Sequence, residues 1–283
     1  MRCDLHVHTR HSGMCTVPAL NRICRESYND PEEVYETLKR RGMDLVTVTD
    51  HDSIDAVERL ESRPDFFLSE EVSAVTPGGN QVHIGVYGIT SRRHVGLQAR
   101  RNDFEALLAY MREQDLLFSV NHVFSSLTGR RCNDDFGYFR TLFPAVETLN
   151  GQIPRVVNRS AATFASQWRK TVVGGSDSHT LDGLGRTYTE VHGAQTAAEF
   201  LAQLRAGHAH VCGESGSYWK LTRAVWKIGC CMGCENPWTA VLAPLLLAVP
   251  LITLGNLVQE QMFNYCWSRR VQHLGARAGV ETA

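Results

Sequence analysis

Histidine and carboxylate residues recur along the chain at the ends of short apolar segments. The set consists of His6, His8, Asp50, His51, Glu71, His83, His122, Asp177 and His179. Residues two apart on a strand point to the same side, so His6 and His8, in the sequence CDLHVHTRHSG, can present two imidazoles to one ion. Nitrogen and carboxylate ligands together favour Mn²⁺, Fe²⁺ or Zn²⁺ over Ca²⁺ or Mg²⁺. The set therefore predicts a metal centre.

Each member of this set also has an ordinary explanation. A single histidine is more often a surface or core residue than a ligand. The sequence TDHDS, which contains Asp50 and His51, is also typical of a strand-end turn and a helix start. Glu70 and Glu71 can be one exposed and one paired carboxylate. The metal interpretation depends on joint placement, because ligand-type residues stand at six expected strand ends.

Short apolar segments alternate with helical patterns up to about residue 213. Strands are expected at residues 2–8, 44–50, 66–75, 82–89, 116–122, 145–149 and 171–176. Helices are expected at 31–42, between Pro31 and Gly42, and at 103–114 and 196–206. This order is typical of an α/β protein with a parallel sheet, either a barrel or a doubly wound sheet. In both, the carboxyl ends of the strands would bring the predicted ligands together.

The ordered motifs DLHVHT, VTVTDHDS, EEVS, HIGVYG, VNH and GGSDSH resemble those of the PHP (polymerase and histidinol phosphatase) superfamily of metal-dependent phosphoesterases. The resemblance covers about residues 1–213. It implies a distorted (β/α)7 barrel with two or three divalent metal ions at the carboxyl ends of its strands. The ligands that it implies are His6, His8, His51, Glu71, His83, His122, Asp177 and His179. Glu71 is the implied bridging carboxylate, because the family pattern E-x-S matches Glu71 and not Glu70.

One departure from the family pattern falls in the opening stretch. Many members carry an Asp or His five or six residues after the second histidine, where this chain has Gly13 and Met14. His11 and Cys15 are close to this position but not in register, and His11 is expected in an exposed loop. The usual ligand residue of the third metal, or one ligand residue of the second metal, is thus missing from this position of the sequence.

The resemblance implies hydrolysis of phosphate esters by a hydroxide that bridges two metal ions. Glu71 and Asp177 would serve as catalytic ligands, and Asp50, beside His51, would orient a ligand. Three arginines in loops expected on the active face would grip a substrate phosphate, although ordinary solvated arginines are the alternative at each position. They are Arg130, Arg131 and Arg186.

The chain looks most like the nucleotide phosphatase and 5′→3′ exonuclease branch, with nucleotides or the 5′ ends of short oligonucleotides as expected substrates. The 29 basic and 30 acidic residues give no electrostatic reason to expect long nucleic acid as a partner. Three alternatives stay open: a catalytically reduced, membrane-associated binding or regulatory module, a histidinol-phosphatase-like activity, and a metal-dependent amidohydrolase.

The composition changes after residue 213, so we predict a phosphoesterase domain at 1–213 and a hydrophobic helical tail at 214–283. Residues 236–258 carry no charged side chain. A helix of this length is long enough to cross a membrane. Just before them, tryptophans alternate with basic residues, as in helices at a lipid interface. Membrane association is therefore expected through 219–258. A single span, a hairpin broken at Pro244 and Pro250, and a soluble helix packed on the barrel or a second subunit stay open.

The nine cysteines lack the paired spacing of a secreted disulfide scaffold, and no cleavable signal is expected at the N-terminal end of this sequence. The expected location is the cytoplasm or the cytoplasmic face of a membrane.

Overall fold

Two β-sheets form the centre of the protein. The computed structural model describes the backbone of residues 1–280 and the side chains of residues 1–271. The larger sheet has the order β2-β3-β4-β5-β6 and the smaller one β1-β7-β8. The strands are β1 Arg2–Cys3, β2 Ser69–Val75, β3 Gln81–Tyr87, β4 Leu117–Val120, β5 Ala145–Asn150, β6 Thr171–Gly175, β7 Thr187–Val191 and β8 Ala209–Gly213. This arrangement is mixed α/β, as the sequence predicts.

Helices cover these sheets and continue into the C-terminal segment. They are α1 Pro31–Arg40, α2 Val57–Leu60, α3 Ser91–Gln98, α4 Phe104–Glu113, α5 Asn133–Leu142, α6 Arg155–Gln167, α7 Ala197–Arg205, α8 Tyr218–Glu235 and α9 Val249–Val280, with 3-10 helices η1 Arg10–Ser12 and η2 Pro237–Ala248. The three helices expected from spacing correspond to α1, α4 and α7, which confirms them. Side-chain caps fix their starts: Asp30, Asp103 and Thr196 each accept a hydrogen bond from a backbone N–H of the first turn.

The expectation of a fully parallel sheet is wrong for its first half. β2 pairs antiparallel with β3, and β3 antiparallel with β4, whereas β4, β5 and β6 are parallel. Only residues 76–80 connect β2 to β3. So short a turn joins antiparallel neighbours, because a parallel pair needs a crossover of a dozen or more residues.

The predicted strands 2–8 and 44–50 form only in part. β1 is limited to Arg2–Cys3, and single pairings connect Val7 with Ser178, Val46 with Phe66 and His51 with Glu71. The backbone N–H of Thr49 donates to the Val7 carbonyl at 2.8 Å. These pairings place the ends of the two segments beside β2 and β6. The strands are assigned to two sheets, and the closed seven-stranded barrel stays a prediction.

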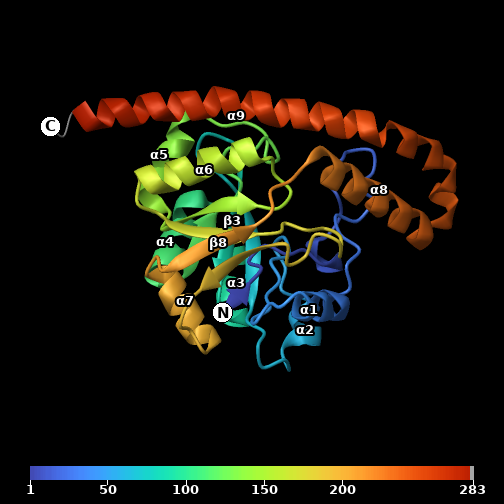
Figure 1. Ribbon diagram of the computed structural model, residues 1–283, viewed down its shortest axis with the longest axis horizontal. Coiled ribbons are helices and arrows are strands. Elements are labelled where there is room, and N and C mark those ends of the chain that lie inside the picture. Colours follow the sequence, from blue (N-terminus) through green and yellow to red (C-terminus); the bar gives the residue numbers. More distant parts are fainter. Residues whose placement is uncertain (281–283) are drawn as a thin grey trace.

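The C-terminal helices are partly packed on this fold. Figure 1 shows α9 extended along one side of the molecule, over α5 and α6, with α8 at one end. Trp267 of α9 is buried in the main hydrophobic core, and its ring stacks on Phe136 of α5 with centroids 5.3 Å apart. Glu260 accepts a hydrogen bond from the backbone N–H of Ser126 at 2.8 Å. The middle of α9 is thus attached to the globular part.

The segment before this attachment is apolar and exposed. The continuous helical stretch Pro237–Val271 is long and apolar enough to cross a membrane, and its most apolar window of 18 residues is only 11% buried. Length and composition alone support this, and a soluble core helix can share both. The low burial, however, is unlike that of a core helix.

Candidate metal centre

The eight ligand-type side chains that the resemblance implies lie in one cluster, with the buried carboxylate of Glu71 in contact with five of the others. Its Oε2 lies 3.2 Å from His6 Nε2, 3.5 Å from His8 Nε2 and 3.3 Å from His51 Nδ1. Its Oε1 lies 3.7 Å from His83 Nδ1 and 3.5 Å from His122 Nε2. One carboxylate therefore contacts five imidazoles from four separate chain segments.

Asp177 provides the second carboxylate of the cluster. Its Oδ1 lies 3.2 Å from His8 Nε2, 3.5 Å from His6 Nε2 and 3.8 Å from His179 Nδ1. His6 and His8 therefore stand between Glu71 and Asp177, with their Nε2 atoms facing both carboxylates. This arrangement allows His6 and His8 to share an ion with either carboxylate or with both.

The backbone is shaped to point these side chains inward. His122 and Asp177 follow β4 and β6 with φ of 34° and 51°, in the left-handed region that non-glycine residues seldom adopt. Such conformations persist where the surrounding structure fixes them, and they are common at functional sites. Gly175 lets β6 approach the His6 segment, since a Cβ there would lie 2.3 Å from the His6 nitrogen. The packing of β6 against the His6 segment therefore explains why the second position of GGSDSH is a glycine.

Asp50 lies one step behind the cluster, with its carboxylate buried. It accepts hydrogen bonds from the Ser12 hydroxyl, the Thr9 backbone N–H and the Thr9 hydroxyl, each at 2.6 Å. The Ser12 oxygen is 3.0 Å from Nδ1 of His8. Asp50 thus fixes the orientation of His8 through Ser12, whereas the sequence placed it beside His51 as a group that orients a ligand.

Three further buried side chains hold the ligands, and the sequence analysis did not identify them. Glu147 in the middle of β5 contacts Nδ1 of His6 at 2.7 Å and accepts a hydrogen bond from the His122 backbone N–H at 2.9 Å. Asn121 donates to Glu71 at 2.7 Å, and Asn150 donates to Asp177 at 2.9 Å. Outer partners of this kind set ring orientation and ligand basicity in metal sites. Glu147 carries a sequence signal in retrospect, since it is a charged residue in the middle of the expected strand 145–149.

The electrostatics of the cluster favour ionised carboxylates but divide the imidazoles into two groups. Burial opposes ionisation, yet the surrounding imidazoles hold the pKa of Glu71 and of Asp177 well below the usual range. Burial, together with the charge of His179, lowers the pKa of His8 to about 3. Burial likewise keeps the pKa of His83 well below its ordinary value. Against the effect of burial, nearby carboxylates instead raise the pKa of His6 and His179, and that of His51 to about 9. Since neutral imidazoles bind metal, an ion would displace protons from these three rings.

The donor atoms also fit a metal because several have no other partner. Among the described residues, buried atoms without a hydrogen bond include His6 Nε2, His8 Nε2, Glu71 Oε2 and His179 Nε2. Buried polar atoms are nearly always hydrogen-bonded, so a concentration of unpartnered ones needs an explanation such as a bound ion. Four overlapping sets of three donors have their atoms within 4.8 Å of one another.

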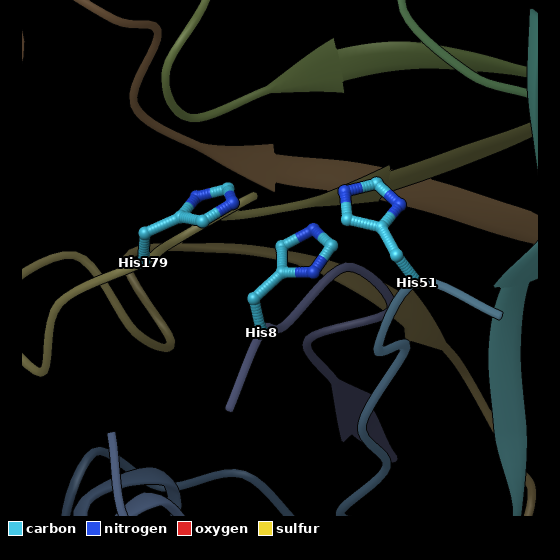
Figure 2. A group of neighbouring side chains, drawn as sticks. All are labelled: His8, His51 and His179. Carbon is cyan, nitrogen blue, oxygen red and sulfur yellow. The ribbon is translucent and has the colours of Figure 1, made fainter. Parts of the chain in front are cut away.

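One of these sets joins three distant parts of the chain. Figure 2 shows the imidazoles of His8, His51 and His179 facing one another, each from a different segment. The ring centroid of His8 lies 4.3 Å from that of His179 and 4.7 Å from that of His51. His11, in η1, belongs to none of the candidate sets formed by the described residues.

Glu70, the neighbour of Glu71, points to the opposite side of β2. Its Oε2 lies 2.9 Å from His94 Nδ1 and accepts a hydrogen bond from Gln98 at 2.8 Å, both on α3. Successive residues of a strand alternate between its two faces, so only one of the pair can reach the cluster. The choice of Glu71 over Glu70 agrees with this placement.

The three arginines suggested for phosphate binding differ in their surroundings. Arg131 is buried, and its guanidinium donates to the Gln81 carbonyl at 2.8 Å and to the Thr128 hydroxyl at 2.6 Å. It therefore holds its own loop, and this use of its donors is at odds with phosphate binding. Arg130 is exposed. Arg186 is also exposed and donates to the Asp182 carbonyl at 2.9 Å, so only Arg130 and Arg186 keep donors available.

Glu26 joins the cluster although the sequence analysis did not single it out. Its Oε1 lies 3.5 Å from His51 Nε2 and 3.6 Å from His179 Nε2. Burial opposes its ionisation, but the nearby imidazoles of His179 and His51 hold the pKa of Glu26 well below the usual range. No strand or motif marks this residue, which lies in a loop, so local sequence carried no signal for it.

Comparison with known proteins supports the superfamily and the fold. Residues 156–209 match the family model described as PHP-associated. An uncharacterized protein of Methanocaldococcus jannaschii, MJ1587, is 33% identical over 54 residues, which is 19% of this chain and 30% of that protein. The match thus spans less than a third of this relative's length.

Two solved structures match this chain at low sequence identity, and the first of them has a similar fold. PsfC from Pseudomonas syringae is 17% identical, with a TM-score of 0.52 over 73% of this chain and 93% of that one. The lesion-specific endonuclease PfuEndoQ from Pyrococcus furiosus is 16% identical, with a TM-score of 0.49 over 74% of this chain and 57% of that one. The chain is thus similar to the PHP superfamily over residues 156–209, and the motif residues that resemble this superfamily gather in one cluster.

Proposed function

We propose that this chain is a metal-dependent phosphoric ester hydrolase. The observation that carries the proposal is the convergence of ionised carboxylates and imidazoles whose buried donor atoms have no other partner. Divalent ions of the Mn²⁺, Fe²⁺ or Zn²⁺ type would supply Lewis acidity toward a phosphoryl oxygen and lower the pKa of water. The PHP-associated match favours a phosphate over a carbonyl substrate.

The residues of the chain divide the remaining tasks. Glu71, as the central carboxylate, and Asp177 would hold the ions from opposite sides of His6 and His8. Asp50 would keep the His8 ring in one orientation through Ser12. An arrangement fixed in advance by such contacts needs little reorganisation during the reaction.

The proposed substrates are nucleotides or the 5′ ends of short oligonucleotides. This rests on the resemblance to the nucleotide phosphatase and exonuclease branch and on the exposed Arg130 and Arg186, whose guanidinium groups suit phosphate. The balanced charge of the chain favours small substrates over long nucleic acid.

A screen of phosphate esters tests the proposal. The protein, loaded with Mn²⁺, Fe²⁺ or Zn²⁺, is incubated with nucleotide bisphosphates, 5′-phosphorylated oligonucleotides, sugar phosphates and, in parallel, amide substrates. We expect phosphate release that His8→Ala and Asp177→Ala abolish and that the matched control His11→Ala retains. A folded, metal-loaded protein that releases no phosphate would contradict the proposal, and amide hydrolysis would favour the amidohydrolase alternative.

We further propose that the exposed part of the C-terminal segment rests on a lipid bilayer. Leu245, Leu247 and Leu251 are between 61% and 76% exposed, which is unusual for large apolar side chains in water. Trp219 and Trp238 are also exposed nearby in the chain, and tryptophan is enriched at membrane interfaces. The basic residues of α8 favour an anionic lipid surface. Because Glu260 and Trp267 attach the middle of α9 to the globular part, a surface-bound segment fits this structure better than a full span.

Vesicle sedimentation tests this second proposal. The full chain is mixed with vesicles of phosphatidylcholine with and without phosphatidylserine. We expect Leu247→Glu with Leu251→Glu to reduce the bound fraction strongly, while Val95→Glu, at an exposed apolar position on α3, leaves it unchanged. Equal binding by the wild type, the double leucine variant and Val95→Glu would contradict a role for this segment.

A further inference from the structure

The loop between Gly13 and Glu26 folds back so that its two ends lie side by side. Met14 and Arg25 form an antiparallel pairing, and the Cys15 N–H donates to the Cys24 carbonyl at 3.0 Å. The Glu26 N–H donates to the Gly13 carbonyl at 3.1 Å. Glu26 is therefore placed beside Gly13, the position at which the sequence lacks a ligand-type residue.

The Glu26 carboxylate points at two imidazoles of the metal cluster. A single oxygen, Oε1, lies 3.5 Å from His51 Nε2 and 3.6 Å from His179 Nε2. Two ligand atoms on one tetrahedral ion, with bonds of about 2.0–2.1 Å, lie about 3.3–3.4 Å apart. Both contacts are close to this separation and too long for good hydrogen bonds. His179 Nε2 is buried and has no hydrogen-bond partner among the described residues.

We propose that Glu26 is a metal ligand that, together with His51 and His179, completes a further cation position in the cluster. It replaces the ligand missing at Gly13 and Met14, and it reaches the site through the fold-back of the loop. Two imidazoles and one carboxylate suit Mn²⁺, Fe²⁺ or Zn²⁺. The inference rests on the proposed metal centre and adds a ligand to it.

Contacts with the C-terminal segment hold this loop from outside. Arg25 Nε lies 2.8 Å from Glu235 Oε1 at the end of α8, and the Asn236 side chain donates to the Ile23 carbonyl at 3.3 Å. Glu235 is a carboxylate that supports the loop but does not contact the imidazoles that Glu26 faces. It therefore provides a matched control that separates loss of a ligand from loosening of the loop.

The test counts bound metal directly. Wild type, Glu26→Gln and Glu235→Gln are dialysed against limiting Mn²⁺, and ions per chain are measured by elemental analysis and by calorimetric titration. We expect Glu26→Gln to lose one ion per chain, with affinity at that position reduced about 100-fold or more, since even outer partners of a ligand are worth about 10- to 100-fold. Glu235→Gln should keep the wild-type count.

The outcomes separate this inference from the proposed centre. A Glu26→Gln protein with the same count and affinities as wild type overturns the role of Glu26 and leaves the centre intact. A wild-type protein that binds no divalent ion overturns the centre and the inference together. Anomalous diffraction from wild-type crystals soaked in Mn²⁺ needs no variant: an ion bonded to Glu26 supports the inference, and ions bonded only to other residues overturn it.

Discussion

Replacing Trp267 by alanine tests whether α9 is part of the folded domain. The sequence suggests a separate tail from residue 214, whereas Trp267 is only 8% exposed and belongs to the same core as Phe136, Phe139 and Phe164. Its ring stacks on Phe136 with centroids 5.3 Å apart. A side chain in this position would be an apolar anchor of α9 on the globular part.

The expected effect on stability is large. Truncation of a buried Trp or Phe to alanine costs about 3–5 kcal/mol, because apolar burial is lost and a cavity is left. For a chain of this size each kcal/mol lowers Tm by about 2 °C or more. Trp267→Ala should therefore lower Tm by roughly 6–10 °C.

The assay is thermal unfolding followed by circular dichroism, with a chelator present so that bound metal does not mask the change. The matched control is Trp219→Ala, which removes the same side chain from a position that is 72% exposed. Surface substitutions usually change stability by no more than about 0.5 kcal/mol, so its Tm should shift by about 1 °C at most. Equal Tm values for the two variants would refute the packing argument and favour an independent tail.

Three further predictions concern the metal cluster. Asp50→Asn should weaken metal affinity about 10- to 100-fold in calorimetric titration, since Ser12 would no longer be held to orient His8. Unchanged affinity would contradict this role of Asp50. Glu147→Gln should destabilise the metal-free protein by about 1–3 kcal/mol in urea unfolding, because buried partners, including the His6 ring, lose a charged acceptor; wild-type stability would argue against this role. Removal of metal by a chelator should lower Tm, and a divalent ion at 100 times its Kd should restore about 2.7 kcal/mol; a Tm indifferent to metal would speak against a bound ion.

Much of the local structure could be read from the sequence because its causes are local. The starts of α1, α4 and α7 depend on capping residues next to them in the chain, and apolar spacing identifies the buried face of each helix. The strands β2 to β6 were expected from apolar segments of the right length. Strand direction was not determined in this way, since it depends on how long each connection is and where it runs.

The sequence by itself determined which ligand-type residues stand at strand ends, from His6 to His179, since residue types and their order along the chain define the motifs. Only the tertiary structure decided their partners. Asp50 acts on His8 and not on its neighbour, Glu147 supports His6, and Glu26 reaches His51 through a folded loop. Such contacts join residues many positions apart, and their distances depend on the packing of the whole chain. Neither periodicity nor spacing along the sequence contains that information.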